Sequence, residues 1–215
     1  MMKRSSARER NRRSILDAAS EVLRQDPEAT LDDVAARAGV VRRTVYGHFA
    51  NRQALLVALV HAAAADFVEQ VGEVDTAAAD PATELAAVVV RTWSTARRNG
   101  PLITLARQTV DAEVRAAMTP FHAVMARLIA HGQQSGVFAR HVDAAILGEV
   151  LENGSATYLR AAESGRWDGD ETDVAVGHLL TLGVPPEAAR DAVARAVPAA
   201  GRRSRHGHPV PRGLG

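Results

Sequence analysis

Apolar residues recur every three or four positions along most of the chain, which is the spacing of helices that bury one face. The first such stretch predicts a helix from about Arg10 to Arg24, and Pro27 ends it. Its apolar stripe consists of Ile15, Ala18, Ala19, Val22 and Leu23. Alanine is abundant and runs of β-branched residues are few, which also favours helix over strand.

Two short helices joined by a tight turn are predicted next. Thr30 and Asp33 have the spacing of a capping box, which opens a helix. Gly39 stands where a left-handed residue ends that helix. Another short helix follows from about Val41 to His48. This arrangement predicts a helix-turn-helix.

The rest of the chain is predicted to be helical with short breaks, so the expected fold class is all-α. The expected helices span about 52–74, 81–99, 101–110, 111–135, 143–163, 172–182 and 186–197. We divide the chain into a flexible basic arm over 1–9, a helix-turn-helix head over 10–52, a helical body over 53–198 and a basic tail over 199–215. The tail is rich in Gly, Pro, Arg and His, and we expect it to be disordered.

Composition limits the compartment and the classes of chemistry. Of 215 residues, 47% are hydrophobic, which is enough for a packed core. The chain has no cysteine, which excludes disulfides, thiolate zinc sites and cysteine nucleophiles. We find no apolar signal core after Met1 and no apolar run of about 18 residues that would span a bilayer. We therefore expect a cytoplasmic protein with no membrane partner.

Charge is unevenly distributed along the chain, although the net charge is only +1. Residues 1–52 carry 11 basic and 7 acidic side chains, whereas residues 53–201 carry 11 basic and 18 acidic ones. Residues 202–215 add four arginines and no acid. A basic end on an acidic body is expected when one end meets a polyphosphate, although a solvated charged tail would have the same composition.

The second helix of the predicted helix-turn-helix carries the chemistry for binding DNA. It is short and polar, and it contains Arg42, Arg43, Thr44, Tyr46 and His48. The major groove of DNA admits one helix, and arginine is the commonest side chain that reads guanine edges there. Thr, Tyr and His side chains supply hydrogen bonds to phosphates. The alternative is an ordinary solvated helix, with Tyr46 packed and His48 serving as a helix-end cap.

Residues 30–56 resemble the DNA-binding signature of the tetracycline-repressor (TetR) family. The matching positions are Thr30, Ala35, Ala38, Gly39, Val40, Thr44, Tyr46, His48, Phe49, Arg52, Leu55 and Leu56. The resemblance implies a three-helix, homeodomain-like head followed by a helical ligand-binding and dimerisation body. It also implies that Thr30, Thr44, Tyr46, His48 and Arg52 contact phosphates, while Arg42 and Arg43 face base edges.

Position 41 departs from the pattern of the family, which usually has serine there. Val41 cannot cap the helix, and a lost N-cap costs about 0.5–2 kcal/mol. Its side chain either contacts a thymine methyl group or packs inward, and we favour inward packing.

The resemblance places a small-molecule pocket among the helices between about 81 and 164. Large or polar side chains set in apolar faces are the candidate ligand contacts. They are Trp93, Gln108, Phe121, His122, Met125, Asn153, Thr157 and Tyr158. A buried amide such as that of Asn153 must find a partner, which a ligand would provide. Ordinary core or dimer packing is the alternative for each of them. Because pocket walls are mostly aliphatic, we expect an amphipathic or hydrophobic effector.

The resemblance further implies a homodimer formed by the helices at about 143–164 and 172–182. A symmetric dimer predicts a palindromic double-stranded DNA operator. The expected function is a one-component transcriptional regulator, a repressor that a small ligand releases from its operator by changing the separation of the two heads.

Other functional classes find little support in the sequence. No glycine-rich phosphate loop, nucleophile elbow or paired-histidine motif is present, so we expect no enzyme and no cofactor. His206 and His208 in the tail form a poor specific metal site, and we expect no metal. A helical adaptor that binds protein or acidic lipid through its basic face is the remaining alternative, and it predicts no sequence-dependent affinity for DNA.

Overall fold

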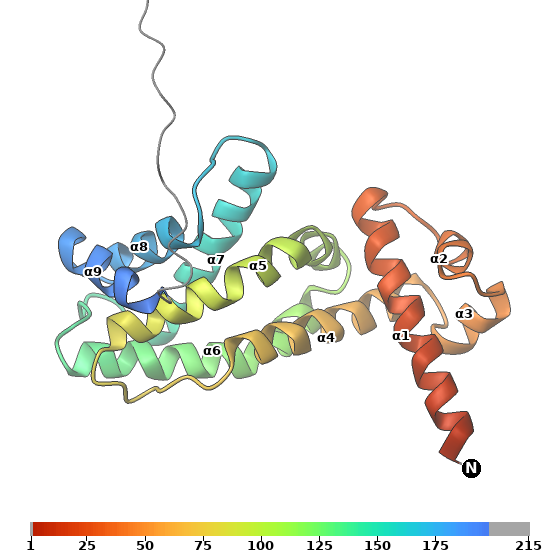
Figure 1. The fold of residues 1–215 in the computed structure, drawn as a ribbon, viewed down its shortest axis with the longest axis horizontal. Coiled ribbons are helices and arrows are strands. Elements are labelled where there is room, and N and C mark those ends of the chain that lie inside the picture. The colour runs from red at the N-terminus through yellow and green to blue at the C-terminus, as the bar shows by residue number, and fades with distance from the viewer. Residues whose placement is uncertain (1, 198–215) are drawn as a thin grey trace, which may run out of the picture.

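The structure, a computed structural model, describes residues 2–197 and is helical throughout, with no strand in that range (Figure 1). The helices are α1 (Met2–Gln25), α2 (Leu31–Ala38), α3 (Arg42–His48), α4 (Arg52–Val71), α5 (Pro81–Arg107), α6 (Asp111–Gln134), α7 (Ala144–Glu163), α8 (Glu171–Thr181) and α9 (Pro186–Ala196). The tail assigned to 199–215, with His206 and His208, lies outside the described residues.

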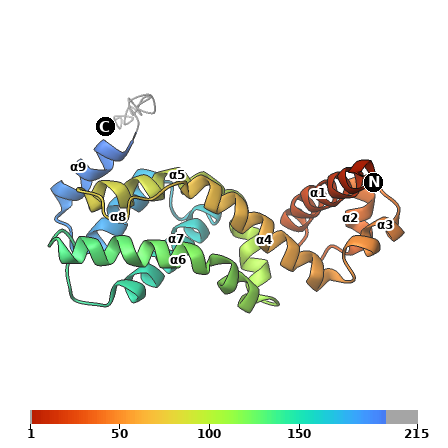
Figure 2. The same cartoon turned by 90° about the horizontal axis from the view of Figure 1, so that it is seen from below.

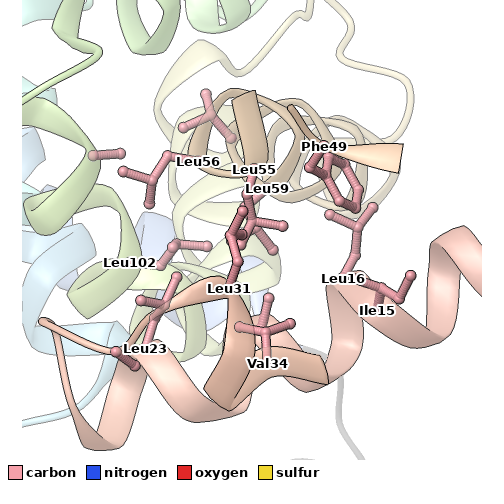
Figure 3. Close-up of a cluster of buried hydrophobic side chains, with 14 of the residues drawn as sticks. Ile15, Leu16, Leu23, Leu31, Val34, Phe49, Leu55, Leu56, Leu59 and Leu102 are labelled. Atoms are coloured by element: carbon pink, nitrogen blue, oxygen red, sulfur yellow. The ribbon is translucent and has the colours of Figure 1, made fainter. Parts of the chain in front are cut away.

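The first three helices form a head at one end of an elongated molecule, and α4 leads from this head into the body (Figures 1 and 2). The apolar stripe of α1 packs on α2 and on the start of α4 (Figure 3). The buried side chains of this cluster include Ile15, Leu16, Leu23, Leu31, Val34, Phe49, Leu55, Leu56, Leu59 and Leu102. The predicted stripe of the first helix is therefore the core face.

The first helix is longer than the sequence pattern predicted. It begins at Met2, so residues 2–9 continue α1 and do not form a separate flexible arm. No glycine or proline interrupts residues 2–25, and Arg, Lys, Glu and Ala in this stretch are good helix formers. The basic residues near the N-terminus are thus arranged on a helix.

The fifth helix corrects a second expectation, because one helix replaces the two predicted at 81–99 and 101–110. Helix α5 continues through Pro101, although that proline has no N–H to donate to the carbonyl of Arg97. Buried residues on both sides, such as Thr95 and Leu102, hold the helix in place. Tertiary packing therefore outweighs the cost of an internal proline, which is about 3 kcal/mol.

The body packs α5 against α4, α6, α8 and α9, and α6 against α7. Its own buried cluster includes Leu85, Leu128, Ile129, Leu147, Leu151, Leu179 and Leu182. The ring of Phe138 fills the space over Gly132 of α6, where a Cβ atom would overlap it. The remaining predicted helices agree with the structure to within about three residues, the largest difference being the end of α4 at Val71.

The core of the head extends beyond the boundary predicted at residue 52. It includes Leu55, Leu56 and Leu59 of α4, and Leu102 and Leu105 of α5. Of the helices among residues 2–197, α4 alone is long and apolar enough to cross a membrane by length and composition. Its buried leucines belong to the head core instead.

Candidate nucleic-acid interface and internal cavity

A capping box and a left-handed glycine build the turn between α2 and α3. The backbone N–H of Thr30 donates to Oδ2 of Asp33 at 2.8 Å, and the N–H of Asp33 donates to Oγ1 of Thr30 at 3.3 Å. The hydroxyl of Thr30 also donates to Oδ2 of Asp33 at 2.6 Å, and this bond, followed by the one from the backbone N–H of Thr30, lowers the pKa of Asp33. Gly39 has φ 65°, which allows the chain to turn into α3. The hydroxyl of Thr30 is thus already engaged in the cap.

Helix α3 has one buried and one exposed face. Val45 and the following Phe49 are buried in the head core. Arg42, Arg43 and Tyr46 are exposed, with Tyr46 at 51%. Thr44 and His48 are half-buried at the edges. The structure therefore brings the five polar residues predicted for this helix to its outer side and edges.

Val41 contradicts the favoured expectation of inward packing. Its side chain is 67% exposed, and as the N-cap residue of α3 it makes no side-chain hydrogen bond. Its backbone is extended, with φ −74° and ψ 147°. The absence of a cap was predicted correctly, whereas the direction of the side chain was not.

Arg42 forms an ion pair that the sequence pattern did not reveal. Its Nη2 lies 2.9 Å from Oδ2 of Asp32, on the first turn of α2. The spacing along the chain gives no indication of this contact, because the turn at Gly39 brings the two residues together. Arg43 has no such partner.

Arg52 is anchored within the head. Its Nη2 donates to the carbonyl oxygen of Pro27, and its Nε donates to that of Ala29 at 3.4 Å. The side chain therefore joins the start of α4 to the loop between α1 and α2. This loop-holding role was missed, because sequence reasoning considered only a phosphate.

A cavity of about 480 Å³ lies in the body and is lined by residues of α4, α5, α6, α7 and α8. Five of the predicted ligand contacts line it: Trp93, Gln108, Phe121, Met125 and Asn153. The amide of Asn153 is not the buried group we expected. The residue is exposed, and its Nδ2 donates to the carbonyl oxygen of Glu149 at 2.9 Å.

The other three predicted contacts lie elsewhere. Thr157 and Tyr158 line a second, more open cavity of about 410 Å³ between α7 and α8, together with Trp167. His122 lines neither cavity, and its Nε2 lies 2.7 Å from Oε2 of Glu152. The eight candidates therefore do not form one site.

Polar residues in the main cavity that the sequence did not single out include Asn99, Ser155 and His178. His178 is 4% exposed, and burial lowers its pKa to about 4. Its Nε2 lies 2.8 Å from Oγ of Ser155. Nε1 of Trp93 and Nδ2 of Asn99 are buried with no hydrogen-bond partner. A lone polar residue in an apolar stripe was the only indication of these positions.

Comparison with known proteins identifies the head. Residues 15–59 match the family model described as bacterial regulatory proteins, tetR family. The head of this chain is therefore similar to the DNA-binding domain of tetR-family regulators. All seven residues predicted to contact DNA lie within the matched range, whereas the predicted ligand contacts lie outside it.

Two curated relatives agree with this assignment. The chain is 56% identical over 55 residues to the HTH-type transcriptional repressor LfrR of Mycolicibacterium smegmatis. This stretch makes up 26% of this chain and 29% of the relative. It is 42% identical over 67 residues to the uncharacterized HTH-type transcriptional regulator TtgW of Pseudomonas putida, covering 28% and 50%. The matches thus span half or less of the curated relatives. Both relatives are named as HTH-type transcriptional regulators and not as enzymes.

The similarity of fold extends beyond the head into the body. The crystal structure of the TetR-like transcriptional regulator LfrR from Mycobacterium smegmatis in complex with proflavine superposes with a TM-score of 0.61 at 25% identity. The superposition covers 82% of this chain and 96% of the LfrR chain. The body was expected to be helical from its spacing, and its arrangement is similar to that of a TetR-like regulator.

Proposed function

We propose that this protein is a one-component transcriptional repressor that a small molecule releases from a palindromic operator. The observation that carries the proposal is α3, whose exposed face presents Arg42, Arg43 and Tyr46 while Val45 anchors it in the head. The names of the relatives support a DNA-binding regulator. The proposed place of action is the cytoplasm, where the bacterial chromosome lies.

In the proposed complex, α3 lies in the major groove. Arg43 and Arg42 reach base edges, with Arg42 leaving Asp32 to do so. Thr30, Thr44, Tyr46, His48 and Arg52 are the proposed phosphate contacts. Arg52 retains N–H groups beyond those bonded to the loop carbonyls, because a guanidinium has five.

A homodimer is proposed on the exposed apolar residues of the last helices. Ile146 and Val150 of α7 are 50% and 45% exposed, and Leu180 of α8 is 43% exposed. Burying these side chains against a second copy would remove them from water. Two-fold symmetry would then present two heads to two half-sites of an operator.

Two continuous helices provide a route from the cavity to the head. Leu55 and Leu59 of α4 are in the head core, while Phe67 of the same helix lines the cavity. Likewise Leu105 of α5 is in the head core, and Trp93 lines the cavity. A ligand that favours one arrangement of α4 and α5 would therefore shift the position of the head, by as much as its differential affinity allows.

The DNA-binding part is tested by selecting sequences from random double-stranded DNA with the purified full chain. We expect a palindromic site, and we expect Arg43→Ala to weaken binding to it by about 1–3 kcal/mol. Arg190→Ala, an exposed change far from the head, is the matched control. Recovery of no preferred sequence at moderate salt would overturn the proposal.

The dimer is tested with Ile146→Glu and Val150→Glu, measured by light scattering after size exclusion. We expect the variants to be monomeric and to lose most of their operator affinity, because one head contacts only one half-site. Val68→Glu, at an exposed valine of α4, is the control that should remain a dimer. A variant at position 146 or 150 that is still dimeric contradicts this interface.

A further inference from the structure

The main cavity contains a hydrogen-bond donor that finds no acceptor among residues 2–197. This donor is Nε1 of Trp93, a residue that is 4% exposed and lines the cavity. An indole N–H only donates, so no change of tautomer or rotamer can turn it into an acceptor. Leaving such a group buried and unsatisfied costs free energy, which an acceptor atom would recover.

A second unsatisfied donor lies on the same helix. Nδ2 of Asn99 is buried without a partner, and Asn99 also lines the cavity. Asn99 is six positions after Trp93, which corresponds to a rise of about 9 Å along α5. The two donors therefore suit a ligand with two acceptor atoms at different positions along α5. A ligand with a single acceptor would bond to Trp93 alone.

The charged groups of the cavity are either paired or exposed. Nη2 of Arg107 lies 2.7 Å from Oε1 of Glu152. Arg160, whose Nη2 donates to Oγ1 of Thr157 at 3.1 Å, is exposed to solvent, and so is Glu163. The buried polar atoms that await a partner are thus neutral donors, not ions.

The remaining walls are apolar. They include Val89, Ile103, Phe121, Met125 and Leu159. A volume of about 480 Å³ is in the range of pockets that bind small organic molecules. Apolar walls favour an apolar skeleton, and the two donors specify where its polar atoms must lie.

We propose that the cavity binds an uncharged, largely apolar molecule with a carbonyl oxygen that accepts a hydrogen bond from Nε1 of Trp93. Asn99 donates to a second acceptor where the molecule has one. This inference rests on the ligand site of the proposed function and specifies its chemical class. It narrows the expectation of an amphipathic or hydrophobic effector by excluding a charged head group at this point.

The ring of Trp167 offers the competing explanation for Trp93. The two indole rings meet edge to face, with centroids 6.0 Å apart and an interplanar angle of 87°. In such a geometry an N–H can point at the face of the neighbouring ring, which is a weak interaction. If the Trp93 N–H points at Trp167, no ligand acceptor is needed.

The experiment compares three probes of one shape on the full chain without DNA: 4-phenyl-2-butanone, butylbenzene and the 4-phenylbutan-2-ammonium ion. Affinities come from ligand-observed NMR titrations of wild type, Trp93→Phe and Trp167→Phe. We expect Trp93→Phe to weaken binding of the ketone relative to butylbenzene by about tenfold, because phenylalanine keeps an aromatic ring but has no N–H. In Trp167→Phe, the ratio of the two affinities should stay as in wild type.

A measurement on the wild-type side chain covers the case in which Trp93→Phe does not fold. The indole N–H resonance of Trp93, assigned by its retention in Trp167→Phe, should move downfield with the ketone and not with butylbenzene. Each of three results would overturn the inference. They are an unchanged ketone-to-hydrocarbon ratio in Trp93→Phe, tighter binding of the ammonium ion than of the ketone, and no ketone binding up to its solubility limit. None of these measurements involves DNA, so the ligand proposal can fail while the proposed DNA-binding function stands.

Discussion

Nη2 of Arg42 lies 2.9 Å from Oδ2 of Asp32, so an ion pair joins the two helices of the helix-turn-helix. The arginine side chain is 72% exposed, and water therefore weakens the attraction. Exposed ion pairs contribute at most about 1 kcal/mol, so in the proposed complex a DNA acceptor can replace the Asp32 carboxylate at low cost.

Asp32→Asn should strengthen binding to DNA. The change removes a negative charge close to the proposed phosphate path and frees Arg42 from its partner. We expect a severalfold gain in affinity at low salt, and we expect this gain to shrink as salt screens the charge that wild type carries at position 32. Titrations of fluorescent DNA over a range of salt concentrations measure both quantities. Glu28→Gln, at an exposed acid of the same head, is the control, and weaker binding by Asp32→Asn would mean that the ion pair prepares Arg42 for DNA.

Val41→Ser should stabilise the protein. Position 41 has the extended backbone of an N-cap and an exposed side chain, and valine makes no capping bond there. A serine hydroxyl can accept from a free N–H of the first turn of α3, so the free energy of unfolding should rise by about 0.5–2 kcal/mol. Urea denaturation measures the change. Thr30→Ala, which removes an existing cap, should lower stability by a similar amount, and a neutral Val41→Ser would show that α3 does not need the cap.

Arg52→Ala should destabilise the head through the loop between α1 and α2. Two carbonyl oxygens lose a charged donor, and hydrogen bonds of this kind contribute about 1.5–3 kcal/mol. Arg52→Lys should restore only part of the loss, because an ammonium group has no planar fork. Arg43→Ala is the matched control in urea denaturation, since an exposed arginine should change stability by less than about 0.5 kcal/mol. Equal stability of the two alanine variants would contradict the loop-holding role.

The stability of the protein should fall in mild acid because of His178. Burial lowers its pKa in the folded protein to about 4, whereas the unfolded chain binds a proton near the ordinary value of 6.5. The unfolded state is therefore favoured as the pH falls from about 6.5 to about 4, at a cost on the order of 3 kcal/mol. Denaturation of wild type and His178→Gln across this range measures the effect. The variant should show a flatter profile, and His61→Gln, at an exposed histidine, should keep the wild-type profile.

Gly132→Ala should destabilise the body. A Cβ atom at this position of α6 would overlap the buried ring of Phe138, and overpacking of a core costs about 1–3 kcal/mol. Gly148→Ala is the matched helical control, because its Cβ would lie 4.0 Å from Cδ1 of Ile129, an ordinary contact. We expect the control to gain about 0.5–1 kcal/mol from better helix propensity. Thermal denaturation of both variants checks the contrast, and equal effects would contradict it.

The head was well predicted because its determinants are local. The cap at Thr30 and the left-handed residue at Gly39 act within a few residues, as does Asn51, whose Oδ1 caps α4 by accepting from the N–H of Ala54 at 2.8 Å. Their spacing along the chain therefore predicted where these helices begin and end. The contacts that were missed are those between residues far apart in the sequence. The ion pair of Arg42 and the carbonyl contacts of Arg52 both depend on how three helices meet, which no single stretch of sequence encodes.

The body was predicted in outline only. Helical spacing located its helices, but Pro101 was expected to begin a new helix, and packing on both sides overrides its local preference. The cavity needed residues of five helices to be placed together. Sequence periodicity distinguishes buried from exposed helix faces, but it does not show which buried faces enclose a cavity. Tyr158 and His122 were therefore predicted to line the main cavity, which neither of them does.

The shared core of head and body limits how such proteins can be recombined. A cut after residue 52 would separate Ile15 and Val34 from Leu55, Leu56 and Leu102, with which they form one cluster. A head grafted onto a foreign body would meet mismatched side chains from α4 and α5. New operator preferences should therefore arise in this lineage by substitution on the outer face of α3, and not by exchange of whole heads.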